Sequence, residues 1–371
     1  MSVTLPKGGQ DLVSVVMPTY NAEKTLDECL ASVERQTHRE LEILCVNDGS
    51  TDGSLAIARK HAAADGRVIV IDKPNEGYGA SCNRGISEAH GAWVAIVEPD
   101  DVLEPTCYED LLACAEQCGG TRGVDVARAA YWRAMPDGKG GEARVSCPYR
   151  GRVRPARQPF AAGEGAELLR HHPAIWAGFY RRDYLVEQGI RFVEVPGAGW
   201  ADNPFLAETL LRTERIAYTD RCVYVYRERD LGEAESFASR SPLTPLERWN
   251  DMMDVAERAG VSDRRVLSAL ALRGVNYALI TTSGAGADAP GVAELVARSM
   301  GRLDPSVVFS EPAISSAGRR LFAEARGIEE PRGGRLAHCA YLAREALYRV
   351  RTNGLSFALS TARSRREGSR V

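Results

Sequence analysis

The stretch Ala95-Ile-Val-Glu-Pro-Asp-Asp-Val-Leu103 decides the expected fold, because a short apolar run ends abruptly in carboxylates. The three acids are Glu98, Asp100 and Asp101. A buried strand that ends in acids puts negative charge at the carboxyl edge of a sheet, where open α/β sheets bind their ligands. Carboxylate oxygens at that edge suit Mg²⁺ or Mn²⁺, held together with the phosphates of a substrate. The alternative is a strand followed by an ordinary acidic turn. The sequence on either side is needed to choose between a metal-binding turn and an ordinary one.

The composition is that of a protein that forms a core. The chain has 371 residues, of which 44% are hydrophobic and 26% charged, and this length suggests roughly two to three domains. The net charge of -3 argues against a globally basic nucleic-acid binder. Nine cysteines without paired metal-ligand spacing, and no recognisable signal peptide, indicate a reducing cytoplasm. No apolar run reaches the ~18 residues that a membrane span requires, so a soluble or peripheral protein is expected.

Three further apolar runs precede the opening stretch, and residues at helical spacing follow each of them. The runs are Val13–Met17, Leu41–Val46 and Val68–Ile71. Asn21 is expected to cap the first helix. This alternation predicts an α/β fold, a parallel sheet with helices on both faces. Polar residues that follow these strands, such as Thr19, Asp48 and Asp100, then meet at one edge of the sheet.

Two nucleotide-binding signatures are missing. A dinucleotide-binding fold needs G-x-G-x-x-G directly after the first strand, but Pro18-Thr-Tyr-Asn21 stands there. Gly77-x-Gly79 follows the third strand instead, which is a weak match on its own. The chain also lacks a Walker A sequence. Dehydrogenase and P-loop chemistry are therefore disfavoured.

Five motifs resemble, in order and spacing, those of family 2 glycosyltransferases, which have the GT-A fold and use nucleotide-activated sugars. They are Val15-Val-Met-Pro-Thr-Tyr-Asn21, Val46-Asn-Asp-Gly-Ser-Thr-Asp52, Asn83-Arg-Gly85, Ala89-His-Gly91 and Ile96-Val-Glu-Pro-Asp-Asp101. The resemblance covers residues 12–230. It implies a GT-A domain, which we place at residues 1–235. A helical C-terminal region is expected over residues 236–371.

The resemblance also implies which residues bind the donor, a UDP-sugar. Asp48 is expected at the base or ribose, and Asp100 and Asp101 at the divalent metal, Mn²⁺ or Mg²⁺, and the diphosphate. A bound cation neutralises the charge that develops on a leaving nucleoside diphosphate. The other residues expected at the nucleotide sugar are Pro18, Thr19, Tyr20, Glu23, Gly49, Lys73, Gly77, Tyr78, Asn83 and Glu98.

Two positions depart from the pattern of the family. The first acid of the metal motif is Glu98 rather than the usual Asp, so Asp100 is the safer ligand. Cys82 stands where the family often has Arg. Arg84 or Lys73 is then expected to supply the missing positive charge.

Trp200-Ala-Asp-Asn-Pro-Phe205 resembles the family segment in which a Glu-Asp pair precedes an apolar helix, and here Ala201 replaces the Glu. Asp202 is the candidate general base, because inverting transfer needs a carboxylate that takes the proton of the acceptor hydroxyl. The alternative role for Asp202 is an N-cap of the helix that follows.

Segments on either side of this motif lead to further predictions. Residues 136–158 are expected to form a long variable loop near an acceptor site. Ile216–Tyr218 and Val223–Tyr226 predict two final strands. Either Arg227 or Arg229, which follow them, reaches a phosphate or lies solvated at the surface.

From Leu243 onward the strand patterns vanish and helices are expected. Residues 335–371 hold eight Arg against two Glu. Helical spacing between Leu336 and Val350 predicts a basic amphipathic helix, which is typical of binding to a membrane surface. The alternative is a helix packed on the catalytic domain, followed by a disordered tail.

The sequence therefore predicts a metal-dependent inverting glycosyltransferase. It would move a sugar onto a glycan or lipid-linked acceptor in bacterial surface polysaccharide synthesis, in the cytoplasm or at the inner face of the cell membrane. A sugar-phosphate nucleotidyltransferase would need a Gly-rich, Lys-containing signature near the first strand, which is absent. A non-catalytic nucleotide-sugar or glycan-binding module stays open because of Ala201 and Glu98. The sequence leaves the sugar, the acceptor and the oligomeric state undetermined.

Overall fold

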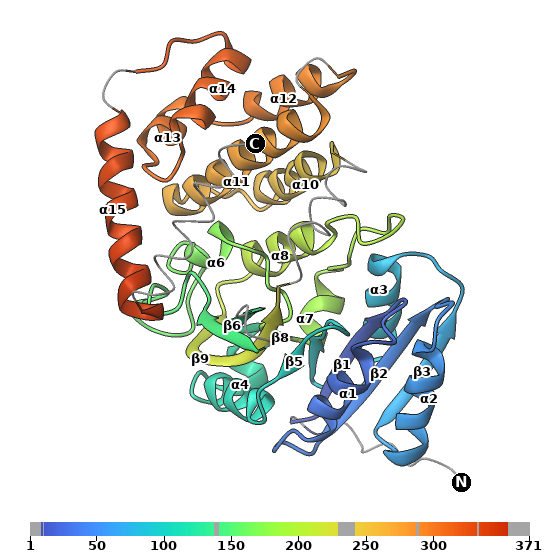
Figure 1. Ribbon diagram of the computed structural model, residues 1–371. Coiled ribbons are helices and arrows are strands. Elements are labelled where there is room, and N and C mark those ends of the chain that lie inside the picture. The colour runs from blue at the N-terminus through green and yellow to red at the C-terminus, as the bar shows by residue number, and fades with distance from the viewer. Residues whose placement is uncertain are drawn as a thin grey trace.

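The computed structural model describes residues 9, 11–136, 141–228, 242–286, 289–331 and 334–354. The strands of these residues form one nine-stranded sheet in the order β3-β2-β1-β4-β8-β6-β9-β5, with β7 paired to β6. Figure 1 shows the sheet in the lower part of the molecule, helices α10 to α14 above it, and α15 along one side. The predicted α/β class with a helical C-terminal region is confirmed.

The first half of the sheet is parallel, as predicted. Its strands are β1 (Val13–Thr19), β2 (Leu41–Asp48), β3 (Val68–Lys73) and β4 (Trp93–Ile96), and the helices between them are α1 (Leu26–Glu34), α2 (Ser54–Ala64) and α3 (Tyr78–Glu88). Every residue of β1 and β2 is buried, which is why these strands appear in the sequence as almost continuous apolar runs. Thr19 lies opposite Asn47, so the polar residues at these strand ends share one edge.

The predicted capping role of Asn21 is wrong. Helix α1 begins five residues later, after Thr25. Asn21 adopts a positive φ of 48°, and its Oδ1 accepts a hydrogen bond from the backbone N–H of Thr51 at 2.9 Å. A short amide side chain tolerates this backbone conformation, and here it joins the loops that follow β1 and β2.

The second half of the sheet is mixed. Its strands are β5 (Val102–Leu103), β6 (Val126–Pro136), β7 (Glu142–Ser146), β8 (Gly178–Arg181) and β9 (Ile216–Arg227). Strand β8 runs antiparallel between β4 and β6, whereas β6 and β9 are parallel. The helices beside these strands are α4 (Cys107–Glu116), α5 (Gly120–Gly123), α6 (Glu167–Arg170), α7 (Arg182–Glu187) and α8 (Asp202–Leu211).

Two predictions for this half are wrong. Residues 136–158 are not all loop, because β7 pairs with the end of β6. Three of the five residues of β7 are exposed, so the sequence has no apolar alternation that would predict this strand. The two predicted final strands are one continuous strand, β9, whose register against β6 shifts near Ala130. Such irregularities bend a strand without ending it.

The C-terminal region is helical, as predicted. It consists of α10 (Thr244–Arg258), α11 (Arg264–Ala285), α12 (Val292–Gly301), α13 (Pro305–Ser310), α14 (Ser316–Arg326) and α15 (Gly334–Asn353). The predicted domain boundary at residue 235 lies outside the described residues. In the part of the chain that the structure describes, no helix is long and apolar enough to cross a membrane.

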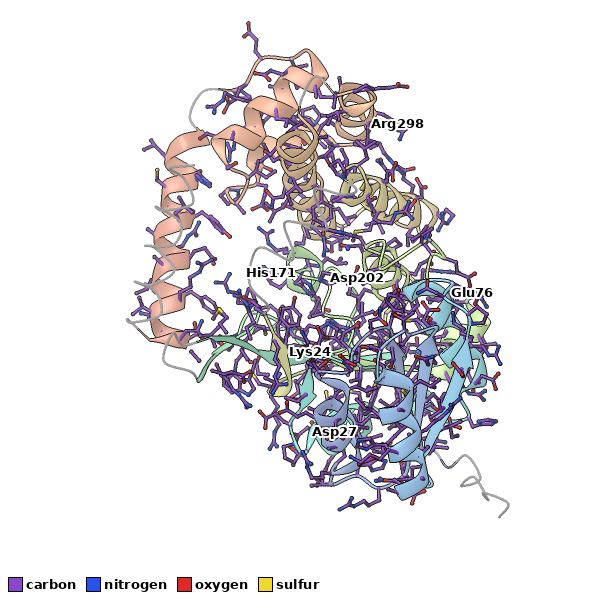
Figure 2. All side chains as sticks on the ribbon, turned by 45° about the vertical axis from the view of Figure 1, so that its right-hand side comes forward. Lys24, Asp27, Glu76, His171, Asp202 and Arg298 are labelled. Atoms are coloured by element: carbon purple, nitrogen blue, oxygen red, sulfur yellow. The ribbon has the colours of Figure 1, made fainter. Side chains whose placement is uncertain are left out.

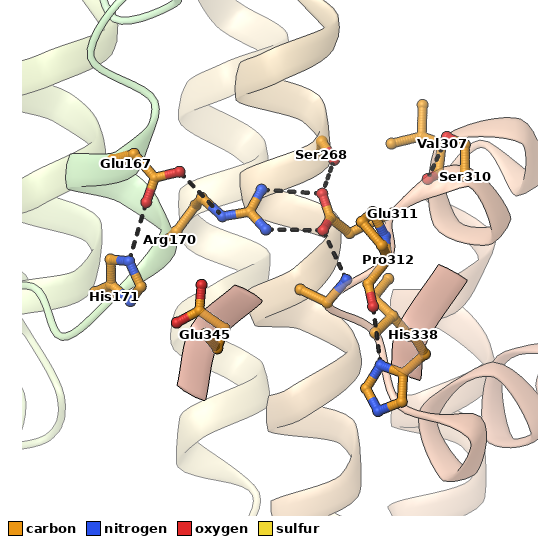
Figure 3. A network of polar contacts seen from close by, with 12 residues as sticks. Glu167, Arg170, His171, Ser268, Val307, Ser310, Glu311, Pro312, His338 and Glu345 are labelled. Carbon is orange, nitrogen blue, oxygen red and sulfur yellow. Dashed lines mark hydrogen bonds and ion pairs between the residues drawn. The ribbon is translucent and has the colours of Figure 1, made fainter. Parts of the chain in front are cut away.

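The helical region and the sheet share one hydrophobic core, which includes Phe205 of α8, Trp249 of α10 and Leu270 of α11. The Trp249 ring lies against Gly274, where a side chain would collide with it. A buried ion pair adds to this contact, because Arg170 of α6 binds Glu311 with two hydrogen bonds of 2.8 and 2.9 Å (Figure 3). The helices are therefore packed on the sheet through both apolar and charged contacts.

Candidate active site

The acidic turn after β4, residues 98–101, is fixed by a strand far away in the sequence. The Tyr224 hydroxyl of β9 donates to Oδ2 of Asp101 at 2.9 Å and accepts the backbone N–H of Glu98 at 3.1 Å. The other oxygen of Asp101 accepts the backbone N–H of Arg227 at 2.8 Å. The Tyr224 ring stacks on Trp176, with ring centroids 4.2 Å apart. Asp101 is buried, and its observed contacts connect the turn to β9; its predicted metal role stays a prediction.

Glu98 and Asp100 lie on the same turn and are both part-buried. Oε1 of Glu98 accepts the hydroxyl of Tyr78 at 2.6 Å. Burial raises the pKa of Glu98 to about 8, and the charges of Asp100 and Asp202 raise it too, although the Tyr78 hydrogen bond opposes the shift. Asp202 therefore lies near enough to the acidic turn for its charge to act on Glu98.

Asp202 is the first residue of α8, at the junction of the sheet and the helical region (Figure 2). Ala201 holds the N-cap position of α8, so the alternative N-cap role of Asp202 is wrong. Instead, Oδ1 of Asp202 accepts the side-chain N–H of Asn203 at 3.0 Å. Burial raises the pKa of Asp202, and the positive charge of Arg273 opposes that shift. The preceding Trp200 has an unusual φ of 55°, a strained conformation of the kind that clusters at functional sites.

The helical region contributes two residues that the sequence analysis missed, Arg273 and Tyr277 of α11. The Arg273 guanidinium, buried beneath α8, donates to Oδ1 of Asn203 and to the Tyr277 hydroxyl. Tyr277 donates to the same Asn203 oxygen at 2.8 Å. Arg273 also donates to the main-chain oxygens of Leu169 and His171 at 3.0 and 2.7 Å. A single Arg inside an apolar helical pattern was the available signal, since a buried guanidinium needs acceptors from other elements.

Asp48, at the end of β2, holds the glycine-rich loop that contains Gly77 and Gly79. Its carboxylate pairs with Lys73 and accepts the backbone N–H groups of Glu76 and Gly77 at 2.9 and 3.0 Å. Gly77 has a φ of 96°, and a Cβ there would collide with the main-chain oxygen of Val195. Glycine is therefore required at this close approach.

Asn83 joins helix α3 to the loop that leads to Asp202. Its side-chain N–H groups donate to the Phe192 main-chain oxygen and to Oε1 of Glu194, and its Oδ1 accepts the Phe192 backbone N–H, all within 3.0 Å. The backbone N–H of Tyr78 binds the Gly197 oxygen at 3.0 Å. The loop before α8 is thus anchored on α3 by two predicted donor-binding residues.

The residues expected around the nucleoside lie at the neighbouring ends of β1 and β2. Pro18 and Thr19 are buried, whereas Tyr20 is 52% exposed. Exposed Glu23 accepts the backbone N–H of Gly53 at 2.9 Å. Gly49 has a positive φ of 67°. Tyr20 therefore offers an accessible aromatic ring beside two buried strand ends, and the role of these residues stays a prediction.

The structure gives other partners to the predicted sources of positive charge. Arg84 forms an ion pair with Glu88 on the exposed side of α3, at 3.0 Å, and its expected role at the diphosphate stays a prediction. Lys73 is paired with Asp48, as described above. Arg227 forms two hydrogen bonds of 2.7 and 2.8 Å with Glu28, and Arg229 lies outside the described residues.

Comparisons with known proteins agree with this architecture. Residues 14–170 match the family model of glycosyl transferase family 2. The uncharacterized glycosyltransferase EpsJ of Bacillus subtilis (strain 168) is 31% identical over 229 residues, which are 58% of this chain and 61% of that protein. TarS residues 1–349 of S. aureus, in complex with UDP-GlcNAc, has a TM-score of 0.66 at 22% identity, with 85% of this chain and 87% of that one covered.

A second solved structure is that of the mannosyltransferase PcManGT from Pyrobaculum calidifontis in complex with GDP-Man and Mn²⁺. Its TM-score is 0.52 at 16% identity, and the match covers 88% of this chain and 86% of that one. At such identities the two structures show the fold alone. The match to EpsJ spans about three-fifths of that relative. Residues 14–170 of the chain are therefore similar to glycosyltransferase family 2, and the chain has the GT-A fold.

Proposed function

We propose that this chain is an inverting glycosyltransferase that moves a sugar from a UDP-sugar to a hydroxyl of a glycan or lipid-linked acceptor, in bacterial surface polysaccharide synthesis. The observation that carries the proposal is that the loop before Asp202 is anchored on Tyr78, whose hydroxyl donates to Glu98 of the acidic turn. The charge of Asp202 acts on both Tyr78 and Glu98. A base on one side and a diphosphate-binding turn on the other are what displacement at an anomeric carbon requires. The likeness to TarS bound to UDP-GlcNAc supports the donor class.

Asp202 would act as the general base. Its carboxylate takes the proton of the acceptor hydroxyl while the acceptor oxygen bonds to the anomeric carbon. The bond from that carbon to the phosphate oxygen breaks in the same step, and the nucleoside diphosphate leaves with the electron pair. Attack from the face opposite the leaving group inverts the configuration. Burial raises the pKa of Asp202, which makes its carboxylate a stronger base.

Asn203, Arg273 and Tyr277 would position that base. The Asn203 side chain donates to Asp202 through its nitrogen, and its oxygen accepts from Arg273 and Tyr277. Because both ends of this amide are bonded, the Asp202 carboxylate has a defined orientation. The Arg273 charge also favours the ionised form of Asp202, which is the form that a general base needs.

We propose that Mn²⁺ or Mg²⁺ binds at the acidic turn as an ion shared with the donor phosphates. Among the described residues, no group of three or more His, Cys, Asp or Glu side chains is arranged to hold a metal by itself. Asp100 is the ligand that we favour, because the first acid of the motif is Glu98 rather than the usual Asp. One or two carboxylates plus substrate phosphates are a usual Mg²⁺ site.

The likeness to PcManGT bound to GDP-Man and Mn²⁺ supports the proposal of a divalent ion shared with the donor phosphates. When bound, the ion would neutralise charge on the leaving diphosphate. The nucleoside would lie at the ends of β1 and β2, where the exposed ring of Tyr20 offers a surface for a base to stack on.

The proposal is tested with a panel of nucleotide sugars in the presence of Mn²⁺. Donors that bind should raise the melting temperature, and those that react should release nucleoside diphosphate. Asp202→Asn should lower turnover roughly 100- to 10,000-fold while donor binding and folding persist. The matched control is Asp183→Asn, an acid with 64% side-chain exposure in the first turn of α7, which should leave turnover unchanged.

The outcomes separate the enzyme from a binding module. Stabilisation by a donor without release of diphosphate from any member of the panel would favour the binding module. Full turnover in Asp202→Asn would show that another group takes the proton.

A further inference from the structure

Helix α15 forms an outer edge of the molecule in both views (Figures 1 and 2). Its inner face makes polar contacts. Glu345 binds Arg152 with two hydrogen bonds of 2.7 and 3.0 Å, and the same guanidinium lies 3.6 Å from the centre of the Tyr348 ring. His338 contacts the main-chain oxygen of Pro312 at 2.9 Å (Figure 3). Among the described residues, none of α15 belongs to the hydrophobic core that the sheet and the other helices share.

The outer face of α15 is apolar. Residues at helical spacing, Leu336, Ala340, Ala343 and Leu347, are all exposed, and the two leucines are 81% and 51% exposed. Leu342, farther round the helix, is 44% exposed. An amphipathic helix of a globular protein normally turns its apolar side toward the core. Here the polar and aromatic side faces the protein, and the leucines face outward.

The charges along this face have one sign. Arg344 and Arg351 are exposed and lie beside the apolar stripe, by the 100° rotation of each helical residue. The sole acid in the sequence of α15 is Glu345, and Arg152 pairs with it on the inner face. The outer face therefore combines leucines and arginines with no carboxylate.

We propose that the outer face of α15 docks on an anionic lipid surface. A helix that lies in a membrane interface inserts an apolar stripe among the acyl chains while its cationic side chains contact anionic headgroups. The helix is about 30 Å long, so Leu336 and Leu347 contact the surface about three turns apart. A second copy of this chain fits less well, because its own Arg344 and Arg351 would lie near like charges. The proposal does not depend on the glycosyltransferase reaction.

The experiment measures cosedimentation of the full chain with vesicles of phosphatidylcholine, with and without phosphatidylglycerol. We expect binding to the anionic vesicles that decreases at high salt. The double variant Leu336→Glu/Leu347→Glu should weaken it roughly tenfold or more for each leucine. In Arg344→Gln/Arg351→Gln, binding should weaken about fivefold for each arginine. An environment-sensitive dye on exposed Cys339 should shift to the blue on binding, because this residue borders the stripe.

Matched controls are Val186→Glu on α7, where the side chain is 66% exposed, and Arg298→Gln on α12, an exposed residue distant from α15 (Figure 2). Both should bind vesicles like the parent. Equal binding by the α15 variants and the parent would overturn the proposal, as would equal binding to neutral and anionic vesicles. A dimer in sedimentation velocity that Leu336→Glu/Leu347→Glu dissociates would assign the face to a second copy instead.

Discussion

The two carboxylate positions of the site, the acidic turn and Asp202, are built by different parts of the chain. The turn after β4 is fixed within the sheet, by Tyr224 and the backbone of Arg227. Asp202 is fixed from the helical region, through Asn203 and Arg273. In the turn, Glu98 and Asp101 accept hydrogen bonds from tyrosine hydroxyls and a backbone N–H, whereas a buried guanidinium lies near Asp202. The helical region therefore takes part in the candidate site, because it orients the proposed base through Asn203, whereas the sheet holds the acidic turn.

The largest expected effect separates two neighbours in the turn. Asp100→Asn should lower Mn²⁺-dependent turnover roughly 100-fold or more, because a metal that neutralises a leaving group contributes several kcal/mol. Asp101→Asn should instead lower the free energy of unfolding by about 1–3 kcal/mol, because its amide nitrogen would face one of the two donors, the Tyr224 hydroxyl or the Arg227 backbone N–H.

The two variants are compared by turnover against Mn²⁺ concentration and by denaturant unfolding. If Asp101→Asn kept full stability and lost metal dependence, Asp101 would replace Asp100 as the proposed ligand. Glu109→Gln, an exposed acid on α4, serves as the control for removing a surface carboxylate.

The second effect concerns the helical region. Arg273→Gln should lower kcat roughly 10- to 100-fold, the equivalent of a lost hydrogen bond to a charged group. Asp202 must be ionised to act, and burial raises its pKa while Arg273 opposes that rise. Loss of the guanidinium therefore raises the pKa further, and the acidic limb of the pH profile should move to higher pH.

The pH profile shows whether Arg273 tunes and positions Asp202 or only stabilises the fold. The charge of Asp202 also acts on Glu98, Tyr78, Cys82 and Tyr277, and these groups remain in this variant. Arg273→Lys keeps the charge and should restore part of the shift. Arg264→Gln, exposed at the start of the same helix, should leave the profile unchanged. An unshifted acidic limb in Arg273→Gln would mean that the helical region does not tune the base.

The parts of the site that the sequence could predict are those that depend on residues close together in the chain. The parallel strands and the acidic turn were predictable because buried β1 and β2 produce apolar runs and polar residues follow them at short range. The residues that fix those acids were not predictable, because they are distant in the sequence and lie in no local motif. Tyr224 is 123 positions from Asp101, and Arg273 is 71 positions from Asp202. Strand β7 escaped prediction because backbone pairing with β6, rather than an apolar face, defines it.

A smaller effect is expected where the glycine-rich loop meets the loop before Asp202. Gly77→Ala should lower the free energy of unfolding by about 1–3 kcal/mol, because its φ of 96° disfavours a side chain and the new Cβ would collide with Val195. Turnover should fall as well, since the displaced loop leads to Asp202. Gly66→Ala, with no atom near its Cβ and no positive φ, should change neither quantity. Unchanged stability of Gly77→Ala would show that the two loops move apart freely.

The smallest effects compare two ion pairs of the helical region. Glu311 is 6% exposed and binds Arg170 (Figure 3), so Glu311→Gln should cost about 1–3 kcal/mol of the free energy of unfolding. Glu345 is 19% exposed in its pair with Arg152, and α15 lies outside the shared core. Glu345→Gln should therefore cost less than about 1 kcal/mol. Its effect should appear as faster amide hydrogen exchange confined to α15, because local opening of a helix without core contacts does not require global unfolding. Slower exchange in α15 when anionic vesicles are added to the parent chain, and not to Leu336→Glu/Leu347→Glu, would connect this weak attachment to the lipid-facing side of the helix.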